Sequence, residues 1–164
     1  MTVLSDKSIR ARLATGSLVI TPEPADEQMQ PASVDLRLGE LMLINGLDWR
    51  MKPKDWIAPG EFIIGHTVES VTIPDDLLGF LHGKSSLARR GLMIHTAGLV
   101  DPGFTGQIVL ELTNVSQHPV ALKPGMSIGQ LTFEELSTPA ERPYGSAGLG
   151  SHYQGQRGAV GARG

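Results

Sequence analysis

The chain has 164 residues, 40% of them hydrophobic, which suits one domain that buries about 70% of the surface of its unfolded chain. The formal net charge of -3 gives no general attraction to nucleic acid, so an anion site must gather lysines and arginines locally. Cysteine is absent, which excludes disulfides, cysteine nucleophiles and cysteine-ligated zinc. No apolar run reaches the length of a membrane span and the N-terminus lacks the pattern of a signal peptide, so we expect a cytoplasmic protein without membrane contact.

The first expected element is a helix near the N-terminus. Ser5 is placed to cap its start, and Leu4 and Ile9 are spaced to form a hydrophobic staple. Gly16 follows the last helical residues and is expected to end the helix.

A strand is expected over residues 33–38, after a proline-containing loop over 21–30. Apolar and polar side chains alternate there, which is typical of a strand with two different faces. Asp35 and Arg37 share the polar face, and the sequence leaves open a salt bridge between them or a loop cap for Asp35.

Further short strands follow along the chain, separated by glycine and proline. They are expected over 18–20, 41–44, 62–73 and 77–82, with turns at 45–46 and 74–76 and a hairpin-like end over 119–122 and 127–136. Short strands at this spacing predict an all-β sandwich or barrel.

The segment 83–91 contains two serines and three cationic side chains. Ser85 and Ser86 precede a short apolar stretch and Gly91 follows it, which predicts one turn of helix with a serine N-cap and a glycine stop. Because a helix start offers free N–H groups, this turn is a candidate phosphate site, with Lys84 and Arg89 adding positive charge.

The segment 101–114 is expected to be a turn followed by a strand. Asp101-Pro102-Gly103 has the composition of a tight turn, and Gln107 to Asn114 alternates. Glu111 then shares one face with Val109 and Thr113, which places a carboxylate among less polar neighbours in a regular strand.

The last twenty residues contain seven glycines and are expected to be mobile in the absence of a ligand. A tail without a role is one alternative. However, its tyrosines, glutamines and arginine give it more hydrogen-bonding capacity than a linker needs, at Tyr144, Tyr153, Gln154, Gln156 and Arg157.

Six motifs of this chain resemble, in order, the dCTP deaminase branch of the trimeric dUTPase superfamily. They are QPASVDLRL (30–38), GKSSLAR (83–89), AGLVDPGF (97–104), VLE (109–111), PGMSIGQ (124–130) and YQGQRG (153–158). The resemblance implies a distorted β-barrel over 1–144 that assembles as a homotrimer with sites at subunit interfaces. It also implies that a glycine-rich arm over 145–164 closes over bound nucleotide.

The resemblance implies a metal-independent deamination step. Glu111 matches the family's proton shuttle, Ser85 the serine that positions water, and Arg89 the arginine that orients both. Deamination needs an activated water and protons delivered to the ring and to the leaving amine, and a half-buried carboxylate can supply all of these.

The matching nucleotide-binding positions fall into groups by the part of the nucleotide that they meet. The resemblance implies a Mg²⁺ ion that bridges the phosphates, and no zinc. The positions that match ligands of the triphosphate are Lys84, Ser86, Arg89, Gln130, Tyr144 and Gln156. Asp101 matches the residue that meets the 3′-hydroxyl, Phe104 an aromatic on the deoxyribose, and Val109 a further binding position. His152 stands where relatives commonly have a lysine on the phosphates, and Asp35 matches, in the dUTPase branch, an aspartate that helps to hold metal-bound water.

The loop at 95–97 departs from the deaminase pattern. Only Thr96 separates His95 from Ala97, whereas deaminases usually have two residues there. In the family, Thr96 and Ala97 match a loop that presents backbone groups to the base and takes part in inhibition by dTTP. The run 97–104 looks more like the bifunctional members of the family than like the members that only deaminate. From the resemblance as a whole we expect dCTP deamination, with or without continuation to dUMP. We keep two alternatives: a plain dUTP diphosphatase, which the shortened loop favours, and a non-catalytic nucleotide-sensing trimer.

Overall fold

The computed structural model describes residues 2–45, 48–50, 55–94 and 98–163, with the backbone alone over 41–45 and 48–50. The strands are β1 (Thr2–Val3), β2 (Val19–Thr21), β3 (Met29–Gln30), β4 (Ser33–Asn45), β5 (Asp48–Arg50), β6 (Trp56–Ile57), β7 (Phe62–Thr72), β8 (Leu77–Gly83), β9 (Leu92–Ile94), β10 (Leu99–Val100), β11 (Thr105–Asn114), β12 (Val120–Ala121) and β13 (Ser127–Glu135). The helices are α1 (Asp6–Thr15), the 3-10 helix η1 (Asp26–Gln28) and α2 (Ser85–Ala88).

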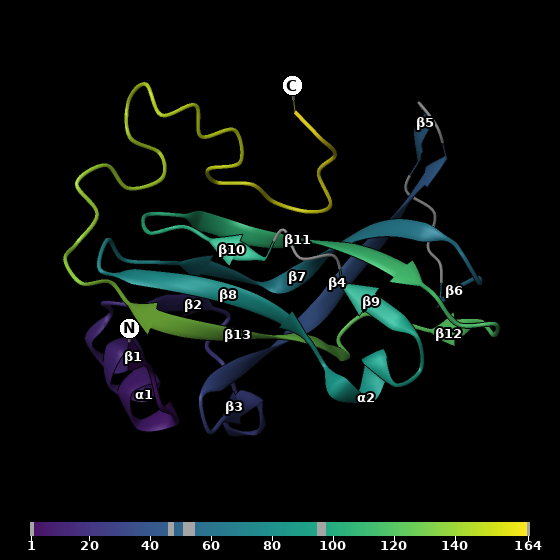
Figure 1. The fold of residues 1–164 in the computed structure, drawn as a ribbon, viewed down its shortest axis with the longest axis horizontal. Coiled ribbons are helices and arrows are strands. Elements are labelled where there is room, and N and C mark those ends of the chain that lie inside the picture. Colours follow the sequence, from purple (N-terminus) through teal and green to yellow (C-terminus); the bar gives the residue numbers. More distant parts are fainter. Residues whose placement is uncertain (1, 46–47, 51–54, 95–97, 164) are drawn as a thin grey trace.

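Most of these strands form one curled sheet. Its main path in the described part of the chain is β10-β8-β13-β4-β7-β11-β9, and each neighbouring pair is antiparallel. In Figure 1, β8 and β13 lie on one side of the molecule, β7 and β11 lie on the other, and the long strand β4 joins the two groups. The expected all-β distorted barrel is confirmed.

The core fills the inside of this curled sheet. Inward-pointing side chains include Leu36 and Leu38 of β4, Leu110 and Leu112 of β11 and Phe133 of β13, and all five are fully buried. Burying a side chain of this size contributes about 1.5–3 kcal/mol, so the alternation fixes which face of each strand turns outward.

Helix α1 begins and ends as expected. The Ser8 amide donates to the Ser5 hydroxyl at 3.5 Å, and Gly16 closes the helix with a φ of 72°. Leu4 and Ile9 are both buried, as a hydrophobic staple requires.

The expected hairpin near the C-terminal end of the sheet is wrong. β12 pairs with β6 in a separate two-stranded sheet, whereas β13 pairs with β4 and β8. The two segments are adjacent in the chain, but each finds a partner more than forty residues away in sequence. Local turn signals carry no information about such pairing.

The expected serine cap of α2 is also wrong. Lys84 is the N-cap residue and no side chain caps the helix, so Ser85 and Ser86 lie inside the turn. Gly91 follows with a φ of 88°, a left-handed conformation that suits glycine and turns the chain towards β9.

The expected turn at Asn45-Gly46 lies only partly in the described residues. The backbone of Asn45 pairs with Asp48 across β4 and β5, as in a hairpin.

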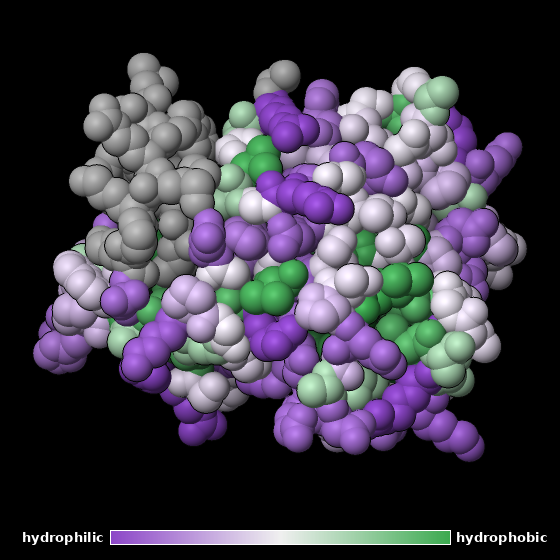
Figure 2. All heavy atoms as spheres, turned by 180° about the vertical axis from the view of Figure 1, so that it is seen from behind, coloured by the Kyte–Doolittle hydropathy of each residue, from purple (hydrophilic) through white to green (hydrophobic). Residues whose placement is uncertain are grey.

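Apolar side chains on the face drawn in Figure 2 form separate small patches among polar ones. Within the described part of the chain, no helix is long and apolar enough to cross a membrane.

Candidate active site

A cavity of about 590 Å³ lies where β7, β10 and β11 meet the C-terminal arm, residues 145–164. Its described lining consists of Phe62, Ile64, Leu99, Val100, Asp101, Phe104, Ile108, Val109, Glu111, Tyr144, Tyr153, Gln156, Val160, Gly161 and Ala162. Lysine and arginine are absent from this lining, which carries two carboxylates among mainly apolar groups. The cavity therefore suits an uncharged, partly aromatic group better than a phosphate.

Glu111 is half-buried in the wall of this cavity. It pairs across the sheet with Ile64, which is buried and also lines the cavity. The strand alternation that buries Leu110 and Leu112 turns the Glu111 side chain to the opposite face, as expected. The carboxylate can therefore exchange protons with a ligand in a partly apolar setting.

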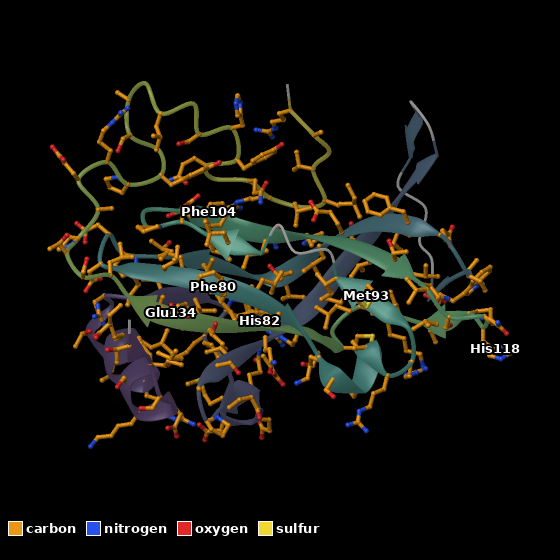
Figure 3. All side chains as sticks on the ribbon, viewed as in Figure 1. Phe80, His82, Met93, Phe104, His118 and Glu134 are labelled. Atoms are coloured by element: carbon orange, nitrogen blue, oxygen red, sulfur yellow. The ribbon has the colours of Figure 1, made fainter. Side chains whose placement is uncertain are left out.

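The other end of the cavity is formed by the turn that precedes β11. The Phe104 amide donates to the Asp101 carbonyl at 3.1 Å, and Gly103 has a φ of 86°, which confirms the expected Asp-Pro-Gly turn. The buried Phe104 ring contacts Tyr144 edge-on, with ring centroids 5.8 Å apart. Figure 3 shows Phe104 beneath the arm.

A second group of predicted site residues lies at the end of β8, away from the cavity. Lys84 forms an ion pair with Asp35, whose carboxylate is nearly buried, and Gln130 of β13 pairs with Asp35 across the sheet. Ser85, Ser86 and Arg89 are exposed on or beside α2. In Figure 1, α2 and the arm lie at opposite edges of the molecule.

The two readings of Asp35 left open by the sequence are both wrong. Asp35 pairs with Lys84, and Arg37 instead donates to Glu69 at 2.6 Å from its side chain and at 2.8 Å from its backbone amide. Glu69 is fully buried and was not predicted to take part in any site or network.

His152 is not among the residues that line the cavity. His152 is exposed and packs edge-on against Tyr153, with ring centroids 6.3 Å apart. Thr96 and Ala97 lie outside the described residues. Sequence reasoning missed Phe62 and Ile64, because only the register between β7 and β11 brings them beside Glu111.

The described residues contain no group of three or more histidine, aspartate or glutamate side chains that could hold a metal ion. One observation does fit an oxygen-seeking cation near the second group. The Oδ1 atom of Asp35 is buried without a hydrogen-bond partner, and carboxylate oxygens commonly accept from Mg²⁺-bound water.

Comparison with solved structures finds the same fold in a dCTP deaminase and in a dUTPase. The 2′-deoxycytidine 5′-triphosphate deaminase of Agrobacterium tumefaciens superposes with a TM-score of 0.70 and 23% identity, over 82% of this chain and 48% of that one. This chain thus spans about half of that structure. The EIAV dUTPase superposes with a TM-score of 0.57 and 24% identity, over 77% of this chain and 95% of its own.

A family model described as dCTP deaminase-like matches residues 3–136, and the chain belongs to this family. This chain is 46% identical to a protein of Mycolicibacterium vanbaalenii named dCTP deaminase, dUMP-forming, and the match covers 98% of this chain and 95% of that protein. A protein of Nocardia farcinica with the same name is also 46% identical, over 98% of this chain and 90% of its own. The family resemblance expected from the motifs is confirmed.

Proposed function

We propose that this chain converts dCTP and water to dUTP and ammonia, and continues in the same site to dUMP and diphosphate. The observation that carries the proposal is the half-buried Glu111 in an apolar cavity wall, with Asp101 at the other end of the same cavity. The near full-length identity to proteins named dUMP-forming supports the same two-step reaction.

In this proposal, Glu111 moves the protons of the deamination step. It takes one proton from the water that attacks C4 of cytosine and passes it to N3. It then takes the second proton from the hydroxyl group left on C4 and passes it to the departing amine, which leaves as ammonia as the C4 carbonyl forms. Ser85 positions that water and Arg89 orients it together with the carboxylate. Asp101 then serves the cleavage at the α-phosphate, which adds water and releases diphosphate.

We infer that the cavity binds the nucleoside and that the second group of residues binds the triphosphate. Phosphates need charge-assisted donors, and the cavity lining provides no cation, whereas Lys84 and Arg89 lie beside α2. One chain keeps these groups apart, so we propose a homotrimer in which neighbouring copies complete each site. The triphosphate ligands would then include Ser86, Gln130 and His152.

Magnesium fits this arrangement as a partner of the triphosphate. It would neutralise phosphate charge, and Asp35 would accept a hydrogen bond from a metal-bound water through its unpaired Oδ1.

We propose in addition that dTTP competes for the nucleoside cavity as a feedback inhibitor.

A product assay tests the proposal. The protein is incubated with Mg²⁺ and either dCTP or dUTP, and the nucleotides are separated by chromatography. Formation of dUMP from dCTP supports the two-step reaction, and dUTP as the final product restricts the activity to deamination. Turnover of dUTP alone indicates a plain dUTP diphosphatase, and tight binding without turnover indicates a sensor.

Replacing Glu111 with glutamine tests its role directly. Glu111→Gln should lower ammonia release from dCTP at least about a hundredfold, because the amide cannot shuttle protons, while dCTP binding measured by calorimetry stays largely intact. Glu27→Gln, the same change at an exposed position, should leave activity unchanged. A Glu111→Gln variant that still releases ammonia would remove Glu111 from this role.

A further inference from the structure

Gln107 bonds to the C-terminal arm with both its backbone and its side chain. Its amide donates to the Gln156 carbonyl at 3.0 Å, and its carbonyl accepts from the Gln156 side chain at 2.9 Å. The amide of Gly158 donates to the Gln107 side-chain oxygen at 2.7 Å. The remaining donor of that side chain reaches the Val68 carbonyl in β7 at 3.1 Å, which fixes the orientation of the Gln107 amide group.

The neighbouring glycine lets the arm approach this closely. Gly106 has a φ of 152°, and a Cβ atom there would lie only 3.0 Å from the Gln156 carbonyl oxygen and 3.1 Å from the Gln156 amide nitrogen. Any larger residue would push the arm away from β11. The Gln154 side chain adds two hydrogen bonds. Its amide group donates to the Gly103 carbonyl at 2.9 Å, and its oxygen accepts from the Thr105 backbone amide at 3.1 Å.

These contacts hold a part of the arm that lines the cavity, because Gln156, which Gln107 binds, is itself a lining residue. Val160, Gly161 and Ala162 line the cavity, and Val160 follows Gly158 by two residues. Gln107 also shares strand β11, and one face of it, with Glu111. The hydrogen bonds from Gln107 to the arm therefore determine where residues 160–162 lie relative to the Glu111 carboxylate.

We propose that Gln107 is a positioning residue for the nucleotide reaction: it anchors the arm on β11 so that residues 160–162 close over the cavity. Gln107 does not itself line the cavity, so it acts through the arm and not through the substrate. The inference rests on the proposed function in that the cavity is the one that binds nucleotide.

Limited proteolysis tests the anchor without any turnover. Trypsin cleaves after Arg157, and the amide of that peptide bond belongs to Gly158, which Gln107 holds. Gln107→Met keeps the size of the side chain and removes the acceptor, so loss of residues 158–164, followed by mass spectrometry, should accelerate about fivefold to tenfold. The melting temperature should stay close to that of the wild type.

Two further variants complete the test. Gln117→Met, the same change at an exposed loop position, should leave cleavage unchanged. Gln107→Glu retains an oxygen that accepts from Gly158 but loses the donor to the Val68 carbonyl, so its cleavage rate should fall between those of the wild type and Gln107→Met. Cleavage of Gln107→Met at the wild-type rate would overturn the proposal.

Steady-state kinetics separate a positioning role from a merely structural one. If the arm closes less often, saturating dCTP still drives closure, so Gln107→Met should raise KM about fivefold to tenfold with little change in kcat. A fall in kcat at unchanged KM contradicts the proposal. Wild-type protein that protects Arg157 through Gln107 but does not convert dCTP would refute the proposed function and leave the anchor intact.

Discussion

Glu69 is the most deeply buried charged side chain among the described residues, and it holds three segments together. Its carboxylate accepts from Arg37 and from the Gln28 side chain, which donates at 3.0 Å and also reaches the Asp35 carbonyl at 2.8 Å. The network thus ties β7 to the part of β4 that carries Asp35, the partner of Lys84. A buried carboxylate of this kind is tolerated only while its partners remain.

Removing the charge of Glu69 should be costly. Glu69→Gln places an amide donor against the donors of Arg37 and Gln28, so the free energy of unfolding in urea should fall by about 3 kcal/mol. Asp26→Asn is the matched control, because it breaks the exposed Arg10–Asp26 pair and should cost less than about 1 kcal/mol. Equal losses in the two variants would contradict this account of the network.

Single residues were predictable where their role is local. Ser5 and Gly16 bound α1 as expected, because helix caps depend on residues within one turn. The partners of Asp35 and Arg37 were not predictable, because Lys84 and Glu69 lie 49 and 32 residues away in the chain. An ion pair across a sheet depends on strand register, which the spacing of charges along one strand does not reveal.

Strands were predicted more reliably than their pairing. The alternation over 107–114 located β11 and the outward face that carries Glu111, because burial imposes a period of two on each strand. The pairing of β12 with β6 was missed, and so was the placement of Phe62 and Ile64 beside β11. These contacts depend on how the whole sheet curls.

Asn114 shows how the end of one strand can organise its surroundings. Its side-chain amide donates to the Ile57 carbonyl of β6 at 2.9 Å and to the His118 carbonyl at 2.8 Å. Its side-chain oxygen accepts from both the backbone and the hydroxyl of Ser116. One fully buried side chain therefore joins β11, β6 and the loop after β11.

Asn114→Asp should loosen this end of the sheet. The change replaces two donated hydrogen bonds with a buried carboxylate facing two carbonyl oxygens, which should cost about 3 kcal/mol and lower the melting temperature by on the order of 10 °C. Ser116→Ala removes a hydroxyl from the same network but leaves those two bonds, so calorimetry should record a smaller decrease of about a third of that. A wild-type melting temperature for Asn114→Asp would refute the structural role.

At the scale of the whole molecule, the candidate site is divided. Sequence motifs identified Glu111, Asp101 and Phe104 together with Lys84, Ser85 and Arg89, but the order of motifs along a chain does not specify which residues share a cavity. The fold places the first three at the cavity and the last three beside α2. If both sets act on one nucleotide, they must come from different copies of the chain, because within one chain the first set lines the cavity and the second lies on or beside α2.

Mixed assemblies of two inactive variants test this division. Glu111→Gln and Ser85→Ala should each abolish deamination as pure proteins. When the two chains are expressed together and assemble at random, a complete site takes Glu111 from one variant and Ser85 from the other, so about a quarter of the sites should recover activity. Glu111→Gln mixed with the double variant should recover none. Ammonia release that stays at the level of the separate variants would place both groups in one chain's site and exclude the shared interface.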